Sequence, residues 1–196
     1  KGHVTTAYDI ALMARELTVK HPEIFEFTTI WMDTITHKTV KGTKEFGLSN
    51  TNKLIRHYEG ATGLKTGSTS EAKFCLCATA SRKGLDLISV VMACPDSKAR
   101  QKDAAALLDY GFGSCRLYKD EVPLAKTVRI PVSAGKKKTV AAEGKEPFYY
   151  VLSNGKEHTI RKKVTCKKQV SAPVKKGTKV GTVSYYDGKK KIGESS

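Results

Sequence analysis

Two β-rich runs joined by a polar turn are the feature that most restricts the fold. The segments "FCLCATA" and "LDLISVVMAC" begin at Phe74 and Leu85, and the four residues "SRKG" separate them. Runs of this composition at this spacing predict an antiparallel hairpin. The preceding "GLKTGST", which begins at Gly63, extends the hairpin to a three-stranded meander.

A helix is expected on each side of this meander. Residues 5–20 carry apolar side chains at spacings of three and four, typical of an amphipathic helix capped at Thr5 or Thr6. Its expected core face consists of Ala7, Ile10, Ala11, Ala14 and Leu17.

Residues 25–58 have a mixed pattern and are expected to form loops and short strands. After the meander, "PDS" at residues 95–97 is a helix start signal. The expected core stripe and stop of that second helix are Ala104, Leu107, Leu108 and Gly111. The first region is thus expected to be α+β, with helices packed on an antiparallel sheet.

Charge is distributed unevenly along the 196 residues. Residues 1–115 hold 15 Lys and Arg against 12 Asp and Glu, a balance of +3, whereas residues 116–196 hold 20 against 7, a balance of +13. The helical period also disappears after residue 116, and short strands such as "TVRIPV" and "FYYVL" alternate with glycine-containing turns. We therefore expect two domains, 1–115 and 116–196, the second a small basic all-β module.

No apolar run approaches the roughly 20 residues of a membrane span, and no charged-then-apolar leader opens the chain. The chain begins at Lys1, directly before the first expected helix. We expect a processed or partial product.

The five cysteines show no spacing typical of a zinc site. No metal and no cofactor is expected. Cys75 and Cys77 lie two apart on an expected strand, so they share a face and are interpreted as small buried residues. The remaining cysteines are Cys94, Cys115 and Cys166.

The triplet Lys65-Thr66-Gly67 stands at the start of the meander. An ammonium and a hydroxyl suit a substrate carboxylate, and a glycine leaves room for close approach to the backbone. An extended peptide can also pair with a strand edge, and backbone N–H groups after the glycine can face an oxyanion. Three letters alone are a weak signal, because Lys-Thr-Gly arises by chance in lysine-rich chains.

Longer segments carry a specific resemblance. "HVTTAYDIALMAREL", "NTNKLIRHYEGATGLKTGSTSEAKFCLCATA" and "LISVVMACPDSKARQKDAAALLDYGF" closely resemble the D-alanyl-D-alanine carboxypeptidases among the low-molecular-mass penicillin-binding proteins. The tail, with "APVKKGTKVGTVSYYDGKKKIGE", is similar to the small β-domain that follows in that family. The resemblance implies part of a β-lactamase/transpeptidase-like domain, α+β, followed by a small all-β domain.

The resemblance also implies roles for individual residues. Lys65 and Thr66 would bind the terminal carboxylate of the peptidoglycan stem peptide, and Gly67 would let that peptide lie along the strand. Ser68 would lend its backbone N–H to the oxyanion hole. Residues 50–52, "NTN", match the polar loop before this strand, although an arginine can stand at the position of Thr51 in relatives.

The nucleophile of this family comes from a Ser-x-x-Lys motif, and a Ser-x-Asn adds a second hydroxyl, both upstream of the segment similar to "HVTTAYDIA". No Ser-x-Asn occurs here. With 13 serines and 28 lysines, about two Ser-x-x-Lys strings are expected by chance, and three occur. Ser70, Ser133 and Ser153 begin them, in turn contexts unlike the helix start that activates such a serine. We therefore expect no catalytic residue in this chain.

Histidines form no sequence pattern with an acid and a nucleophile and are interpreted as surface or capping residues. They are His3, His21, His37, His57 and His158.

The resulting hypothesis is the C-terminal part of a serine D-Ala-D-Ala carboxypeptidase of the bacterial envelope. Its expected partners are a stem peptide ending in D-Ala-D-Ala, β-lactams and the N-terminal half of the catalytic domain, with no nucleic acid. A different hypothesis is a non-catalytic basic module that binds an anionic polymer, such as nucleic acid or a wall polymer. A third, a β-lactamase, is disfavoured because the tail resembles the carboxypeptidases.

Overall fold

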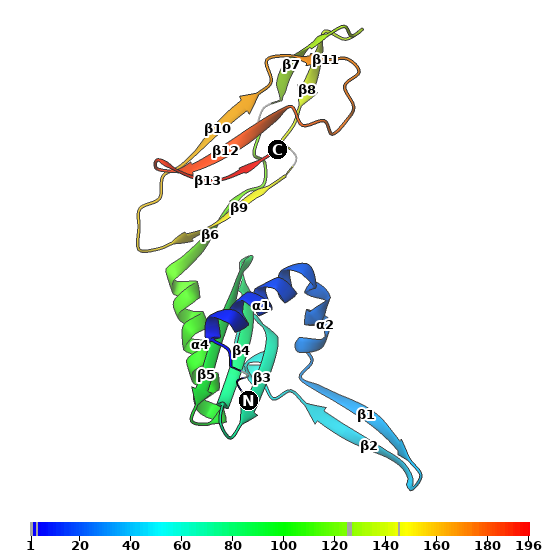
Figure 1. Ribbon diagram of the computed structural model, residues 1–196, viewed down its shortest axis with the longest axis vertical. Coiled ribbons are helices and arrows are strands. Elements are labelled where there is room, and N and C mark those ends of the chain that lie inside the picture. The colour runs from blue at the N-terminus through cyan, green and yellow to red at the C-terminus, as the bar shows by residue number, and fades with distance from the viewer. Residues whose placement is uncertain (1, 3, 125–126, 145) are drawn as a thin grey trace. The chain divides into compact units, whose positions relative to one another are not determined.

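The computed structural model describes residues 2, 4–124, 127–144 and 146–196 (Figure 1). The chain divides into two compact units, Lys1–Ser114 and Cys115–Ser196. The first combines helices with antiparallel strands, and the second consists of strands and turns. The expected α+β class with a strand-rich C-terminal part is confirmed.

The first unit is built on a three-stranded antiparallel sheet of order β3-β4-β5. Its strands are β3 (Ala61–Thr69), β4 (Lys73–Arg82) and β5 (Leu85–Cys94). The predicted meander is therefore confirmed. β4 is central and β3 lies at an edge of the sheet, which leaves one side of β3 without a strand partner among the described residues.

Helix α4 (Ser97–Ser114) covers one face of the sheet. Ala104 and Leu108 are buried there against apolar residues of β4, namely Leu76, Ala78 and Ala80. The prediction of Leu107 as core is wrong, because its side chain is 48% exposed. Positions four apart share a helix face, and the residue that completes the buried stripe is Arg100, at 6% exposure.

Gly111 does not stop α4, which continues to Ser114. A Cβ atom at Gly111 would lie 2.6 Å from Cδ1 of Leu87 on β5. The glycine therefore permits close packing of the helix on the sheet, and the prediction of a helix end here is wrong.

Helix α1 (Ala7–Lys20) lies across the other face of the sheet (Figure 1). Thr6 is the N-cap and forms a capping box with Asp9, as expected for one of the two candidate threonines. The predicted core face is only partly correct. Ala14 is buried, and Ile10 and Ala11 are half-buried, but Ala7 and Leu17 are exposed.

In the sequence between α1 and β3, residues 22–57 form more regular secondary structure than expected. The elements are η1 (Pro22–Ile24), α2 (Phe25–Thr28), β1 (Met32–Thr39), β2 (Gly42–Ser49) and α3 (Leu54–His57). β1 and β2, of eight residues each, form a hairpin that projects from the unit (Figure 1), so the expectation of loops and short strands is wrong here. Every residue of both strands is exposed, including the facing pair Ile35 and Phe46.

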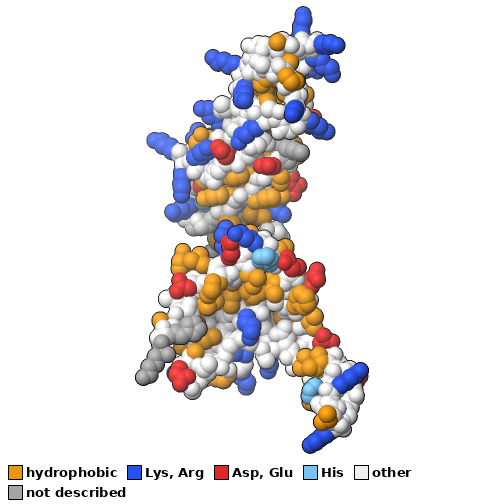
Figure 2. All heavy atoms as spheres, turned by 45° about the vertical axis from the view of Figure 1, so that its right-hand side comes forward, with side chains coloured by type: hydrophobic (Ala, Val, Ile, Leu, Met, Phe, Trp, Pro, Cys, Tyr) orange, Lys and Arg blue, Asp and Glu red, His pale blue; other side chains and the backbone are white. Residues whose placement is uncertain are grey.

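The described residues of the second unit form eight strands in three small sheets, with orders β6-β9, β11-β7-β8 and β10-β12-β13. They are β6 (Cys115–Asp120), β7 (Val128–Ser133), β8 (Thr139–Ala142), β9 (Phe148–Ser153), β10 (Ile160–Cys166), β11 (Val170–Ser171), β12 (Gly181–Asp187) and β13 (Lys190–Ser195). Lysine and arginine side chains are spread over its surface (Figure 2).

An aromatic stack forms the core of the second unit. The rings of Phe148 and Tyr185 lie parallel with centroids 3.8 Å apart. The Tyr185 hydroxyl donates to Asp120 at 2.8 Å, and Lys162 donates to the same carboxylate oxygen at 2.7 Å. Burial raises the pKa of Tyr185 to about 12, and the bond to Asp120 adds to this. Both rings of this pair are buried, so they fill the core and do not lie on the surface.

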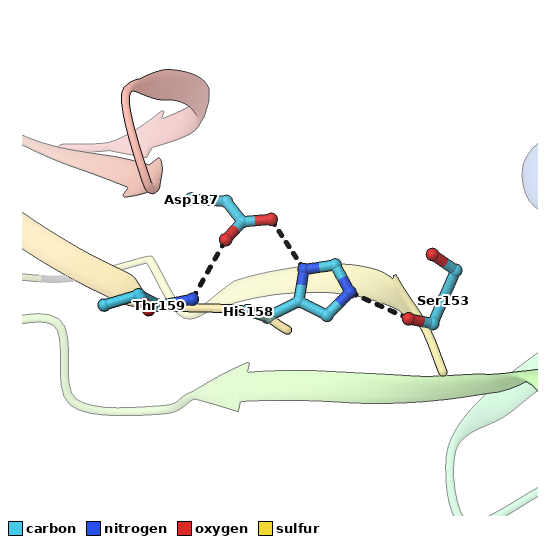
Figure 3. Close-up of polar contacts among 4 residues, drawn as sticks. All are labelled: Ser153, His158, Thr159 and Asp187. Atoms are coloured by element: carbon cyan, nitrogen blue, oxygen red, sulfur yellow. Dashed lines mark hydrogen bonds and ion pairs between the residues drawn. The ribbon is translucent and has the colours of Figure 1, made fainter. Parts of the chain in front are cut away.

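His158 is the exception to the interpretation of the histidines as surface or capping residues. Its side chain is 8% exposed, and its Nδ1 lies 2.6 Å from Oδ2 of Asp187 while its Nε2 lies 2.8 Å from the carbonyl oxygen of Ser153 (Figure 3). The second carboxylate oxygen accepts from the backbone N–H of Thr159. Both ring nitrogens face acceptors, so this geometry favours the doubly protonated imidazolium.

This ion pair predicts a pH-dependent stability. The Asp187 carboxylate, followed by the Ser153 carbonyl, raises the pKa of His158, and the bond from His158 lowers the pKa of Asp187. A raised histidine pKa stabilises fully below the unfolded value of about 6.5, and this stabilisation is lost as pH rises through the folded value. The contribution of Asp187 is instead lost when pH falls through its lowered pKa. We therefore expect the unfolding temperature of the second unit, measured by calorimetry, to decrease as the pH is raised above about 6.5.

His158→Gln should flatten that dependence. His21→Gln is the matched control, because His21 pairs with Glu23 on the surface. Equal pH profiles for the wild type and His158→Gln would contradict the role of the pair.

Candidate functional site

The residues predicted to bind substrate lie together on the edge strand β3. Lys65, Gly67 and Ser68 are exposed, and Thr66 is half-buried. The ammonium of Lys65 donates to the carbonyl oxygen of Thr66. Among the described residues, no carboxylate lies within ion-pair distance of Lys65. Its charge is therefore available to an external anion.

Thr66 meets the loop that precedes β3. The hydroxyls of Thr66 and Thr51 lie 2.6 Å apart, and either can be the donor. When Thr51 donates, the proton of Thr66 is free for another acceptor. Gln101 of α4 donates to the carbonyl oxygen of Thr51 at 3.2 Å and so holds the loop against the helix.

The two asparagines on either side of Thr51 fix this loop. Asn50 donates to the carbonyl oxygens of Thr28 and Ile30, and its own Oδ1 accepts from the N–H of Asn52. Asn52 is 2% exposed and donates to the carbonyl oxygen of Gly63 on β3 at 2.8 Å. The asparagine side chains therefore position Thr51 beside Thr66.

Gly67 faces open space. Among the described residues, no atom lies within 4 Å of the place that a Cβ atom would occupy, and the backbone of Gly67 is not in the left-handed region. Neither packing nor backbone strain within the chain therefore requires a glycine at this position. Close approach of another molecule is the remaining physical reason for it.

A groove of about 340 Å³ runs beside these residues. It lies between α1 and the sheet, and its lining includes Met13 and Leu17 of α1, residues 64–67 of β3 and Met92 of β5. Cys75 and Cys77 both line it, which confirms that they share a face. Cys77 is buried, and burial raises the pKa of its thiol to about 11, but Cys75 is only half-buried, so the prediction for Cys75 is wrong.

Arg100 of α4 contacts β3 from the face of the sheet that α4 covers. Its Nη1 donates to the carbonyl oxygen of Gly67 at 3.3 Å and makes a 3.5 Å contact with that of Cys75. Its guanidinium lies over the ring of Phe74. Sequence reasoning missed both Arg100 and Gln101. The four-residue spacing of Arg100, Ala104 and Leu108 was a signal that could have placed Arg100 on the buried face of the helix.

The three Ser-x-x-Lys serines lie on strands or in turns. Ser70 is in the turn between β3 and β4 and donates to Glu71, while Ser133 and Ser153 end β7 and β9. The ring of His158 contacts the carbonyl oxygen of Ser153, whereas the hydroxyl of Ser153 points away from the ring (Figure 3). His3 lies outside the described residues, whereas the other histidines lie at helix ends, on the hairpin or in the Asp187 pair.

A helix-covered antiparallel sheet with Lys-Thr-Gly on its edge strand defines the class of protein. The Lys-Thr-Gly motif is shared by penicillin-binding proteins and class A β-lactamases. Consistent with this class, residues 1–96 match the model of the D-alanyl-D-alanine carboxypeptidase family, and residues 114–196 match that of the penicillin-binding protein 5 C-terminal domain.

Individual relatives agree with these matches. The chain is 36% identical over 187 residues to the D-alanyl-D-alanine carboxypeptidase DacF of Bacillus subtilis, covering 93% of this chain and 46% of that protein. A solved peptidoglycan synthesis regulatory factor (PBP3) of Streptococcus pneumoniae has a TM-score of 0.70 at 29% identity, covering 94% of this chain and 51% of that one. Penicillin-binding protein 5 of Haemophilus influenzae gives 0.66 at 26% identity, with coverages of 97% and 54%.

The chain therefore belongs to the low-molecular-mass penicillin-binding proteins of the D-alanyl-D-alanine carboxypeptidase family, as the resemblance predicted. It spans about half the length of the curated relatives that it matches. Within the part of the chain that the structure describes, each helix is too short or too polar to cross a membrane.

Asn52 provides a test of how the site is held. Asn52→Ala leaves the carbonyl of Gly63 and the N–H of Leu54 without their partner, so we expect the free energy of unfolding to fall by about 1–3 kcal/mol. Urea unfolding followed by the fluorescence of Trp31, the single tryptophan, measures it. Ser70→Ala, which removes an exposed contact with Glu71, should change it by less than about 0.5 kcal/mol. Equal effects would refute the positioning role of Asn52.

Proposed function

We propose that this chain supplies the carboxylate-binding strand of a serine-type D-Ala-D-Ala carboxypeptidase, which trims the terminal D-alanine from peptidoglycan stem peptides. Residues 1–115 would be the C-terminal part of the catalytic domain, and residues 116–196 an appended basic β-domain. The observation that carries the proposal is the exposed ammonium of Lys65, unpaired by any described carboxylate, beside a threonine hydroxyl and a glycine with free space before it.

These three residues are suited to bind the C-terminal end of a peptide. Lys65 and Thr66 would bind the two carboxylate oxygens, with a charge-assisted bond from the ammonium. Gly67 would allow the peptide to run along the free edge of β3 as an added strand. The N–H of Ser68 would then point at the scissile carbonyl and stabilise the oxyanion.

The reaction itself needs a nucleophile from outside this chain. A serine hydroxyl would attack the carbonyl of the penultimate D-alanine, the terminal D-alanine would leave, and water would hydrolyse the resulting ester. A β-lactam would acylate the same serine. We place that serine and its lysine in an N-terminal half, supplied upstream or as a separate chain.

Exposed apolar side chains on the first unit support the proposal that a serine-bearing N-terminal half packs against it. On α1, Tyr8 is 71% exposed and Met13 58%, and Met92 of β5 is 37% exposed at the groove. Figure 2 shows hydrophobic patches on this unit. A surface of this kind suits contact with another polypeptide. The location that follows from the family is the bacterial cell envelope, outside the cytoplasm.

The alternative of a non-catalytic module that binds nucleic acid has less support. Binding to single strands uses exposed aromatic rings as stacking platforms. In the second unit Phe148 and Tyr185 are buried in the core, although Tyr149 is half-exposed. Strong single-strand binding that weakens steeply with salt would favour this alternative.

Lys65→Ala is the direct test of the proposed carboxylate contact in the longer protein that carries the serine. Loss of a charge-assisted bond, worth about 1.5–3 kcal/mol, should lower kcat/KM for D-Ala-D-Ala peptides by about 10- to 100-fold. Lys83→Ala removes the same charge in the turn between β4 and β5 and should leave kcat/KM unchanged. Equal kinetics for the two variants would exclude a central role for Lys65.

The second test concerns the origin of the nucleophile. The 196-residue chain alone should not be labelled covalently by fluorescent penicillin, whereas the chain combined with the serine-bearing half should be. Gel fluorescence after denaturation measures this. Labelling of the isolated chain would place the nucleophile within it and overturn the proposed division.

A further inference from the structure

Arg100 is a buried cation whose contacts are unusual for its burial. It is 6% exposed, yet among the described residues its polar contacts are the carbonyl oxygens of Gly67 and Cys75, and none of the ion pairs includes it. Its Nε is buried without a hydrogen-bond partner. Removing a guanidinium from water is costly, and two long bonds to carbonyls compensate only in part. An apolar side chain of similar length would pack over Phe74 without that cost, so stability alone does not account for an arginine here.

The two carbonyls are connected to the predicted site. Gly67 and Cys75 are register partners in the β3–β4 ladder. The register between β4 and β5 shifts between Phe74 and Leu76, so Cys75 lies opposite a bulge formed by Met92 and Ala93 of β5. Bulges often lie next to active sites, where they change the direction of local groups. The guanidinium therefore connects the Lys-Thr-Gly strand to the β4 residue that faces this bulge.

The contact with Gly67 fixes more than a single atom. The Gly67 carbonyl and the Ser68 N–H belong to the same trans peptide unit, which is planar, so the two groups point in opposite directions. Holding the carbonyl from the α4 side turns the Ser68 N–H away from α4. This N–H is the group assigned above to the oxyanion.

We propose that Arg100 is a positioning residue for the oxyanion hole: its guanidinium holds the 67–68 peptide so that the Ser68 N–H faces the reacting carbonyl. The kinetic consequence rests on the proposed function, but the structural one does not. Arg100 should act on the transition state, because a misaligned oxyanion donor affects acylation more than ground-state binding.

The chain offers a matched control in Arg82. Its guanidinium also lies over aromatic rings, Tyr58 and Phe112, and also donates to a backbone carbonyl, that of Glu59 at 3.1 Å. Arg82 is at the far end of β4, where it contacts Asp109 and not the Lys-Thr-Gly segment. A purely structural role predicts similar consequences for Arg82→Met and Arg100→Met.

The kinetic test compares these two variants in the longer protein with the serine-bearing half. Stopped-flow acylation by a fluorescent penicillin separates the apparent dissociation constant from the saturated rate. We expect Arg100→Met to slow the saturated rate by about 10- to 100-fold, somewhat less than the loss of an oxyanion donor, with the dissociation constant within about threefold. Arg82→Met should leave both unchanged. A normal rate in Arg100→Met, or a loss confined to affinity, would overturn the proposal.

A second measurement needs no catalysis. Amide hydrogen exchange of the segment Thr66–Ser70 in the 196-residue chain should be about tenfold faster in Arg100→Met than in the wild type, and unchanged in Arg82→Met. If the longer protein is not acylated at all, the proposed function fails, and this exchange result alone decides the role of Arg100. If Arg100→Met does not fold, Arg100→Lys replaces it, because a single ammonium lacks the planar fork that reaches both carbonyls. Unchanged exchange in the folded variant contradicts the inference.

Discussion

The antiparallel pairing of β3 with β4 is the interaction on which the rest of the first unit depends. It places Lys65 opposite Cys77 and Gly67 opposite Cys75, and no strand of the described part of the chain pairs with the other side of β3. An open edge can accept an added strand, and proteins normally protect such edges. Here the edge carries a lysine and a glycine at the groove, which suits a peptide with a free carboxylate better than another sheet.

The surroundings of this strand hold it in place from several directions. Asn52 binds the carbonyl of Gly63 from the preceding loop, Thr51 meets Thr66, and Arg100 contacts Gly67 from α4. These contacts come from elements that are separated in sequence. Lys65 and Gly67 stay exposed at the groove, so the strand is fixed while its functional groups remain accessible.

Local patterns in the sequence were sufficient for part of this arrangement. The meander, α1, α4 and the Lys-Thr-Gly strand follow from periodicity, turn residues and a specific resemblance. The β1–β2 hairpin was missed because neither strand buries a face, so no alternation of buried apolar residues marks it. Leu107 was preferred over Arg100 as a core residue because hydrophobicity was weighted above the four-residue spacing. The contacts of Asn52 and Arg100 depend on tertiary structure and have no local signature.

The family assignment and the exposed apolar surface lead to the same picture of the protein. The relatives are about twice as long as this chain, and α1 and β5 expose apolar side chains beside the groove. In the proposed arrangement the groove becomes a cleft when the serine-bearing half covers these side chains. The chain described here then contributes the binding wall, and its partner contributes the reacting hydroxyl.

The most direct test of this account is a crystal structure of the longer protein, with its nucleophilic serine replaced by alanine, in complex with a peptide ending in D-Ala-D-Ala. The account predicts carboxylate oxygens at about 2.7–2.9 Å from the Lys65 ammonium and the Thr66 hydroxyl, with the peptide extended along β3. A peptide whose carboxylate is bound elsewhere, with Lys65 still turned to the carbonyl of Thr66, would contradict it.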